Sequence, residues 1–183
     1  LGQSSLSLAI HDNEGEFVLQ VKKNCQALYE EVMELFNGLS EEQENDKKGF
    51  LDKYGDHYSE IETSEKNRER YEYRKCQSYS DPDGIKGLQE EPPHVASVGR
   101  MFQVRIMQVQ DEFGDDITPC LTDFLEKGSR KQQKPKAGDE LGNDIQWAGL
   151  VSSRSLTAEE MLEYKRQHWT VENRLHYVLD ETF

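Results

Sequence analysis

Alternation of apolar and polar residues predicts most of the β-structure in this chain. Residues 95–110 (VASVGRMFQVRIMQVQ) alternate strongly and predict a strand. Tyrosines spread among charges in residues 57–79 predict a two-stranded ribbon. Residues 16–22 (EFVLQVK) are almost continuously apolar, which is typical of a buried central strand, and residues 147–154 predict a further short strand.

Three segments have the pattern of helices. Residues 4–11 favour a short helix, and residues 24–39 favour a longer one that Asn24 caps. The apolar face of the longer helix would consist of Ala27, Leu28, Val32, Leu35 and Phe36. A third helix is predicted to start at Thr157, with Glu160 completing a capping box, and to continue through the last residues. Strand followed directly by amphipathic helix indicates an α/β fold.

Two polar segments interrupt this pattern within what we expect to be a single domain over residues 1–183. Residues 40–56 are rich in Glu, Asp and Lys and predict a flexible connector. Residues 113–146 hold a possible short helix at 122–126 followed by a stretch rich in Gly, Lys, Gln and Pro, which predicts a second flexible insertion.

Composition narrows the class of protein. The chain has 34% hydrophobic and 32% charged residues, as in a soluble domain with exposed insertions. It has no apolar run of membrane-spanning length and no signal-peptide pattern, so we expect a cytoplasmic protein without a membrane partner. Three widely spaced cysteines predict free thiols.

The net charge of −14 argues against a free-standing nucleic-acid binder, but the charge is uneven. Residues 1–65 contain 15 acidic and 5 basic side chains, whereas residues 66–183 contain 21 and 17. Five cations fall within ten residues at 127–136, and the 66–75 segment mixes arginines and lysines with tyrosines. Both segments could contact a DNA backbone, or be a solvated loop and an ordinary ribbon face.

The predicted final helix contains the candidate catalytic and metal-binding residues. Its core face would hold Met161, Tyr164, His168, Val171, Leu175 and Val178, and Glu172 lies about 40° from His168 at the edge of that face. Three interpretations stay open. His168, Glu172 and His176 could bind a transition metal, Glu172 could be an ordinary surface acid, or Glu172 could join other carboxylates in binding divalent cations for phosphoryl transfer.

The end of the chain, HWTVENRLHYVLDETF, resembles the end of the catalytic domain of bacterial insertion-sequence transposases of the H-repeat-associated type, within the DDE superfamily. Those proteins carry the pattern HW-x-x-EN-x-LHW-x-LD-x-x-F, and Tyr177 here replaces the second Trp. The resemblance implies that Glu172 is the third catalytic carboxylate and a metal ligand. It implies supporting roles for His168, Trp169, Asn173 and His176.

Other stretches resemble the same family in the same order. FVLQVKKNCQALYEEVMELF is similar to a YVLALKGNQ-x-x-L-x-x-x-V segment, with Lys22 and Asn24 kept, and HYSEIET is similar to HGRIET. VASVGRMFQVR and GLVSSRSLTAEEMLEYKRQHW resemble the later strands and the entry to the last helix. The candidate DNA-binding residues are Lys22 and Asn24 from this resemblance, and Arg130, Lys131 and Lys134 from the cation-rich segment at 127–136.

The family implies a ribonuclease-H-like α/β domain, with a β-ribbon insertion and a long C-terminal helix, that cuts and joins DNA with two Mg²⁺ or Mn²⁺ ions. The match begins just after the family's second catalytic Asp, so we expect an incomplete core that binds no metal by itself, since one carboxylate cannot fix two such ions. Exposed sheet edges would favour a homo-oligomer. The alternative is a domesticated transposase remnant that acts as a non-catalytic protein-interaction module.

Overall fold

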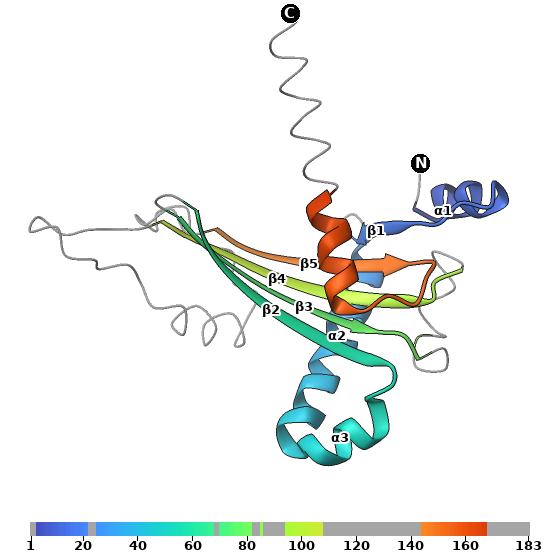
Figure 1. The fold of residues 1–183 in the computed structure, drawn as a ribbon. Helices are drawn as coiled ribbons and strands as arrows, with labels where there is room; N and C mark the ends of the chain where they lie inside the picture. The colour runs from blue at the N-terminus through green and yellow to red at the C-terminus, as the bar shows by residue number, and fades with distance from the viewer. Residues whose placement is uncertain are drawn as a thin grey trace, which may run out of the picture. The chain divides into compact units, whose positions relative to one another are not determined.

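The computed structural model describes residues 3–21, 25–67, 70–81, 85, 94–107 and 144–167 (Figure 1). In chain order the elements are α1 (Gln3–Asp12), β1 (Val18–Val21), α2 (Gln26–Asn45), α3 (Lys47–Tyr54), β2 (Tyr58–Asn67), β3 (Arg70–Tyr79), β4 (Ser97–Met107) and β5 (Asp144–Ser152). Residues 158–167, which follow β5, are also helical. The mixed α/β class is therefore confirmed. None of the helices in the described part of the chain is both long and apolar enough to cross a membrane.

The five strands form one antiparallel sheet in the order β1-β5-β4-β3-β2. The ribbon predicted at 57–79 is the β2–β3 hairpin, but it belongs to this sheet and is not a separate insertion. The chain enters the sheet at one edge with β1, which pairs with β5 so that Val18 lies opposite Ser152 and Val21 opposite Gly149. An antiparallel sheet is not what strand–helix alternation favours, because that alternation is typical of parallel sheets.

The prediction that residues 16–22 form a central strand is wrong, because β1 is an edge strand. Its apolar character has a different cause. Val18 packs against the apolar cluster around helix 158–167, while Val21 lies with Val32 of α2 beside Gly149. An edge strand with both faces covered needs the same nearly continuous apolar sequence as a central strand.

The chain divides into two compact units. The first comprises residues 1–61, 76–101 and 148–183, and the second comprises residues 62–75 and 102–147. Strands β2 to β5 each run from one unit into the other.

In the first unit, helix 158–167 covers one face of the sheet. Its buried residues form an apolar cluster with strand residues of that face: Cys76, Met101, Ala148, Leu150, Leu156, Ala158, Met161 and Leu162. Gly99 of β4 allows this close packing, since a Cβ atom there would meet the Met161 sulfur. Deep packing of this kind fixes the helix on the sheet.

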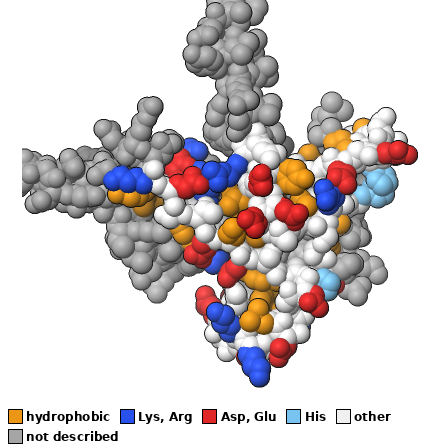
Figure 2. Space-filling model, viewed as in Figure 1, with side chains coloured by type: hydrophobic (Ala, Val, Ile, Leu, Met, Phe, Trp, Pro, Cys, Tyr) orange, Lys and Arg blue, Asp and Glu red, His pale blue; other side chains and the backbone are white. Residues whose placement is uncertain are grey.

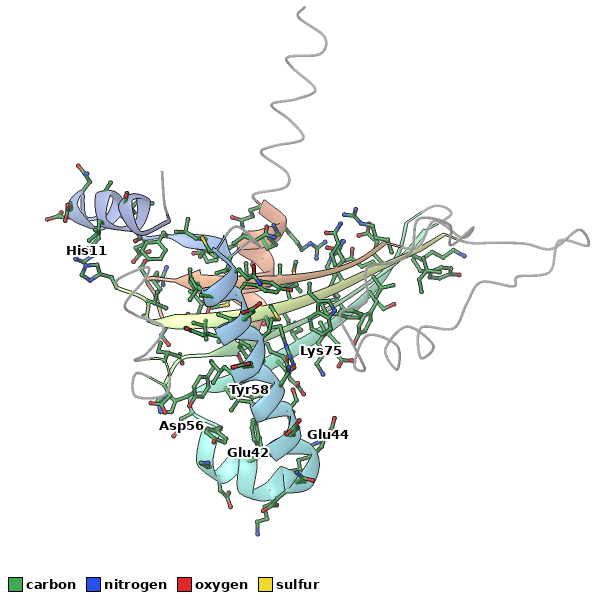
Figure 3. All side chains as sticks on the ribbon, turned by 180° about the vertical axis from the view of Figure 1, so that it is seen from behind. His11, Glu42, Glu44, Asp56, Tyr58 and Lys75 are labelled. Atoms are coloured by element: carbon green, nitrogen blue, oxygen red, sulfur yellow. The ribbon has the colours of Figure 1, made fainter. Side chains whose placement is uncertain are left out.

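Helix α2 packs against the strand residues that point to the other side, as Figure 3 shows from behind. Its buried residues are Leu28, Tyr29, Val32, Met33, Phe36 and Leu39. The predicted face was right at three positions, but Ala27 is exposed and Leu35 only half-buried. The helix begins after Cys25, and the predicted cap Asn24 lies outside the described residues.

Residues 40–56, where we expected a flexible connector, are mostly helical. Helix α2 continues to Asn45, and α3 follows after Asp46, whose carboxylate accepts a hydrogen bond from Gly49 N at 3.0 Å. Phe50 is buried and packs edge-on against Tyr58, with ring centroids 5.0 Å apart. A few widely spaced apolar anchors fix this segment, and its many charged residues conceal them in the sequence.

In the second unit the strands carry an apolar cluster of Tyr73, Phe102, Val104 and Ile106, with Tyr71 and Trp147 packed beside it. Residues 144–146, expected within the second insertion, belong to β5. The rest of that insertion and the helix expected at 122–126 lie outside the described residues.

Helix 158–167 begins as the sequence predicts. Glu160 N donates to Thr157 Oγ1 at 3.3 Å, and Thr157 N donates to Glu160 Oε2 at 2.8 Å, which completes the capping box. Ala158 N donates to Ser59 Oγ of β2 at 2.8 Å. The bonds that Thr157 N and Thr157 Oγ1 donate to the Glu160 carboxylate hold the pKa of that carboxyl below its usual value.

We expect Thr157→Ala to lower the free energy of unfolding by about 1 kcal/mol, because it removes the side-chain half of the capping box. Urea denaturation measures this loss. Ser155→Ala, at an exposed position two residues earlier, is the matched control and should change stability by less than about 0.5 kcal/mol. Equal effects of the two substitutions would contradict the cap.

Candidate functional site

The residues predicted to act in catalysis, metal binding or DNA binding all lie outside the described residues: Lys22, Asn24, Arg130, Lys131, Lys134, His168, Trp169, Glu172, Asn173 and His176. The structure does describe the elements that lead into two of these groups. Strand β1 ends at Val21, directly before Lys22, and the described part of helix 158–167 ends directly before His168.

Strand β1 and helix 158–167 are in direct contact within the first unit. Val18 packs against the apolar cluster that contains Met161 and Leu162. Two residues further along β1, on the same face, Gln20 Oε1 accepts a hydrogen bond from Lys165 Nζ. Gln20 is two residues before Lys22, and Lys165 is three residues before His168. Residues close to Lys22 and to His168 in the sequence are therefore in contact with each other.

The residues directly before helix 158–167 are also hydrogen-bonded to the sheet. Ser78 Oγ donates to Leu156 O at 2.6 Å, and Ser97 Oγ donates to Arg154 O at 2.5 Å. Both serines are buried. Hydrogen-bonded buried hydroxyls of this kind restrict the register of the turn, so the helix leaves the sheet at a fixed position and direction.

Charge differs between the elements on the two sides of the first unit. Residues 25–56, which form α2 and α3, contain nine acidic and three basic side chains. Glu42 and Glu44 of α2, and Asp56 in the turn after α3, are labelled in Figure 3. Helix 158–167 contains three glutamates early and two cations, Lys165 and Arg166, near its end. Acidic and basic side chains are interspersed over the described part of the face in Figure 2. A polyanion would therefore be repelled most strongly by the α2–α3 side.

The basic and aromatic segment at 66–75 is mostly occupied by internal contacts. Arg74 forms ion pairs with Glu72 and, at 3.3 Å, with Glu65, and Lys75 Nζ lies 2.9 Å from Glu62 Oε1. Lys66 Nζ lies 5.0 Å from the centre of the Tyr71 ring. These pairings fit an ordinary ribbon face better than a DNA-binding surface. Arg68 lies outside the described residues.

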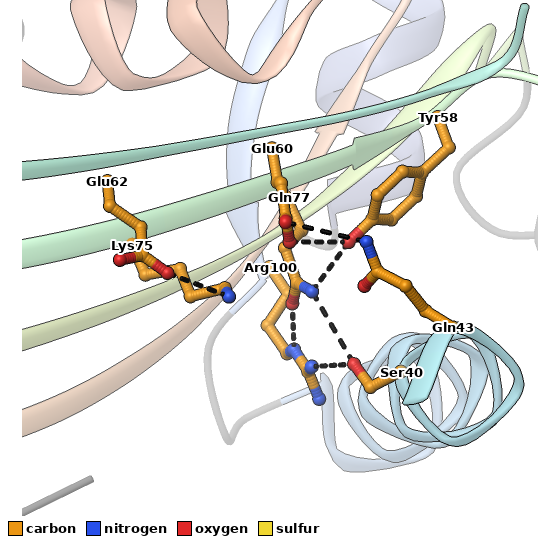
Figure 4. Close-up of polar contacts among 8 residues, drawn as sticks. All are labelled: Ser40, Gln43, Tyr58, Glu60, Glu62, Lys75, Gln77 and Arg100. Carbon is orange, nitrogen blue, oxygen red and sulfur yellow. Dashed lines mark hydrogen bonds and ion pairs between the residues drawn. The ribbon is translucent and has the colours of Figure 1, made fainter. Parts of the chain in front are cut away.

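Sequence reasoning missed a buried polar network centred on Arg100 of β4 (Figure 4). Arg100 is 8% exposed. Its guanidinium donates to Gln77 Oε1 at 2.9 Å, to Asn37 Oδ1 at 2.6 Å and to Ser40 Oγ at 3.1 Å. It also donates to Phe36 O at 3.3 Å and lies over the Phe36 ring, 5.5 Å from its centre. One side chain of the sheet thus binds one turn of α2.

Tyr58 extends this network. Gln77 Nε2 donates to the Tyr58 hydroxyl at 2.8 Å, and that hydroxyl donates to Glu60 at 2.9 Å. Burial is the largest cause of the raised pKa of Tyr58, and the Glu60 charge adds to it. Burial also lowers the pKa of Arg100 to about 10, so the guanidinium remains protonated at neutral pH and keeps all its donors. The network joins α2 to the sheet.

An arginine in an alternating strand gives little sequence signal of burial, because arginine is usually exposed. The position of Arg100 within the strand was the sequence feature that could have indicated its burial. Arg100 is flanked on its own side of β4 by Val98 and Phe102, which are both buried. A charged residue between two core positions indicates a buried polar contact.

We expect Arg100→Met to lower the free energy of unfolding by about 3 kcal/mol, because the acceptors on Gln77, which is buried, and on Asn37 and Ser40 lose their donor. Arg100→Lys keeps the charge without the planar fork of donors and should cost about 2 kcal/mol. Arg154→Met is the control, since its ion pair with Glu16 is exposed and should contribute less than about 1 kcal/mol. Urea denaturation compares the three, and equal losses at positions 100 and 154 would contradict a buried network.

No group of three or more His, Cys, Asp or Glu side chains within the described ranges is placed to hold a metal ion. Glu172, the carboxylate that the sequence resemblance assigns to Mg²⁺ or Mn²⁺, lies outside these ranges. Comparisons of the chain with family models, with curated proteins and with solved structures give no match.

Proposed function

We propose that this chain is a transposase-like protein, corresponding to the part of a DDE-type catalytic core that carries the third metal-binding carboxylate, Glu172. The motif around Glu172 and the family-like stretches before it, in the same order, motivate the proposal. The observation that carries it is the contact between β1 and helix 158–167, through Val18 and through the hydrogen bond between Gln20 and Lys165. That contact joins the elements leading to Lys22 and Glu172.

The described start of helix 158–167 lies against the sheet, since Met161 is buried and Lys165 is half-buried. Glu172 itself lies outside the described residues. Its proposed role rests on the sequence motif, in which a carboxylate would share a divalent cation with other acidic groups.

The ribonuclease-H-like relationship belongs to this proposal. The antiparallel order of the described strands weighs against it, whereas the order of the motifs weighs for it. Because residues 25–56, which contain α2 and α3, are strongly acidic, the proposal places DNA on the side of helix 158–167.

We expect the chain to bind duplex DNA with an affinity that falls steeply with salt. Arg130→Gln/Lys131→Gln/Lys134→Gln should reduce the slope of log K against log salt by about 2.7, because each lost phosphate contact contributes about 0.9. Fluorescence anisotropy between about 50 and 300 mM salt measures the slope.

The matched control removes three lysines from α3, which are exposed: Lys47→Gln/Lys48→Gln/Lys53→Gln. It should leave the slope unchanged. An equal loss in both variants, or no DNA binding by the unaltered chain, refutes the nucleic-acid proposal. A concentration-dependent dimer without DNA binding would instead support the second candidate, a protein-interaction module, which the net charge of −14 favours.

We expect these 183 residues alone not to nick or join DNA in Mg²⁺ or Mn²⁺, because the proposed trio of carboxylates has only Glu172 among them. A supercoiled-plasmid nicking assay tests this. Metal-dependent cleavage that Glu172→Gln abolishes would show that other acids of the chain complete the site.

A further inference from the structure

Strand β2 is an edge strand of the sheet. In the described part of the chain, its one strand neighbour is β3. The part of β2 that belongs to the second unit has exposed side chains at Glu62, Ser64 and Lys66 and half-buried ones at Thr63 and Glu65. An edge strand presents backbone N–H and C=O groups that can pair with a strand of another chain. The side chains along the edge then decide which strand fits.

Three polar groups of this segment bear on that choice. Lys66 Nζ lies 5.0 Å from the centre of the Tyr71 ring and forms no ion pair among the described residues. Glu62 pairs with Lys75 of β3 at 2.9 Å but keeps 52% of its side chain exposed (Figure 4). Thr63 Oγ1 is buried and has no hydrogen-bond partner within the described ranges, whereas buried hydroxyls usually have one.

Antiparallel pairing of β2 with β2 of a second copy accommodates all three groups in one register. A two-fold axis at Ser64 sets Glu62 of each copy opposite Lys66 of the other, and the Cβ atoms of directly opposite residues lie about 4.5–5.5 Å apart. Symmetry makes this opposite-charge pair occur twice. The same register sets Thr63 opposite Glu65, whose carboxylate can accept more than one hydrogen bond.

Other registers fit less well. Opposite residues of paired strands lie on the same face of the sheet, so a two-fold axis perpendicular to the sheet passes through a residue position. An axis at a charged residue would set that residue opposite its own copy. An axis at Thr63 would pair Lys66 with Glu60, but it would also set the apolar Ile61 opposite Glu65. The axis at the neighbouring serine avoids both conflicts.

We propose that β2 is a self-association surface, on which two copies of the chain pair antiparallel about Ser64 and form two Glu62–Lys66 ion pairs between them. The paired segments are short, and stable interfaces usually bury more than about 1,200 Å², so the dimer is weak and depends on concentration. The pairing goes beyond the proposed function, because it needs neither DNA nor Glu172.

Sedimentation velocity of the whole chain over a range of concentrations tests the pairing by charge reversal. Lys66→Glu or Glu62→Lys alone should weaken dimerisation by about tenfold, because each replaces two attractive pairs with two repulsive ones. An equimolar mixture of the two variants should dimerise again, because every reversed residue then faces an opposite charge. At about 0.15 M salt the net charge of −14 is screened, whereas pairs in direct contact are screened less.

The matched control reverses an exposed ion pair of the first unit, that of Lys53 and Glu42, which lie 3.2 Å apart. Lys53→Glu and Glu42→Lys change the net charge by the same amounts and should leave association unchanged, both alone and mixed. Equal effects of the two sets of variants would show that net charge and not β2 controls association, which would overturn the proposal.

Oxidative cross-linking tests the register and keeps both charges of the pair. Ser64→Cys should form a covalent dimer above the level of the unaltered chain, because the two copies of residue 64 meet at the axis. Lys66→Cys should not, since the two copies of residue 66 would lie roughly 14 Å apart along the strands, beyond the reach of a disulfide. A cross-link at position 66 without one at position 64 would overturn the register.

Two further results would overturn the proposal. One is an unaltered chain that remains monomeric at every concentration. The other is a mixture of Lys66→Glu and Glu62→Lys that associates no better than either variant alone. Urea midpoints show whether each variant is folded, and the Ser64→Cys cross-link decides if a charge-reversed variant is not.

Discussion

The packing of the first unit depends on burial of both faces of the sheet, with helix 158–167 on one side and α2 on the other. Successive residues of a strand point to opposite sides, so each strand must supply apolar residues to two layers. Gly99 and Met101 of β4 meet helix 158–167, whereas Arg100 between them meets α2. The same alternation places Gln20 and Val18 of β1 towards helix 158–167 and Val21 towards α2. Register within the sheet therefore decides which side chains can meet the predicted site.

Arg100 shows how a polar residue can serve that packing. A buried guanidinium is costly unless its donors are used, and those of Arg100 bond Gln77, Asn37, Ser40 and Phe36 O. Because these partners come from β3 and from one turn of α2, the network fixes the helix against the sheet more specifically than apolar contact alone. It lies on the α2 side, while the contact between Gln20 and Lys165 lies on the side of helix 158–167.

Sequence patterns predicted those elements whose cause is local. The capping box of Thr157 and Glu160 and the alternation of β4 depend on neighbouring residues, and both are confirmed. Features that depend on tertiary packing could not be predicted from local sequence patterns. The apolar run of β1 indicated a central strand because a strand with both faces covered has the same sequence pattern at an edge. Helix α3 was missed because its few apolar residues, Phe50 among them, stand among many charged ones. The same contrast holds for the candidate site. The sequence motif predicted Glu172, whereas the contact between β1 and helix 158–167 is known only from the fold.

Site-specific photo-cross-linking to duplex DNA tests the central claim most directly, namely that DNA lies against the side of the chain where Lys22 and Glu172 are expected to converge. A photoreactive phenylalanine would replace Lys22, Glu172 or, as the reference on the acidic side, the exposed Glu34 of α2. The account predicts cross-links from positions 22 and 172 and none from position 34. Cross-links from position 34 alone, or from none of the three under conditions where the chain binds DNA, would contradict it.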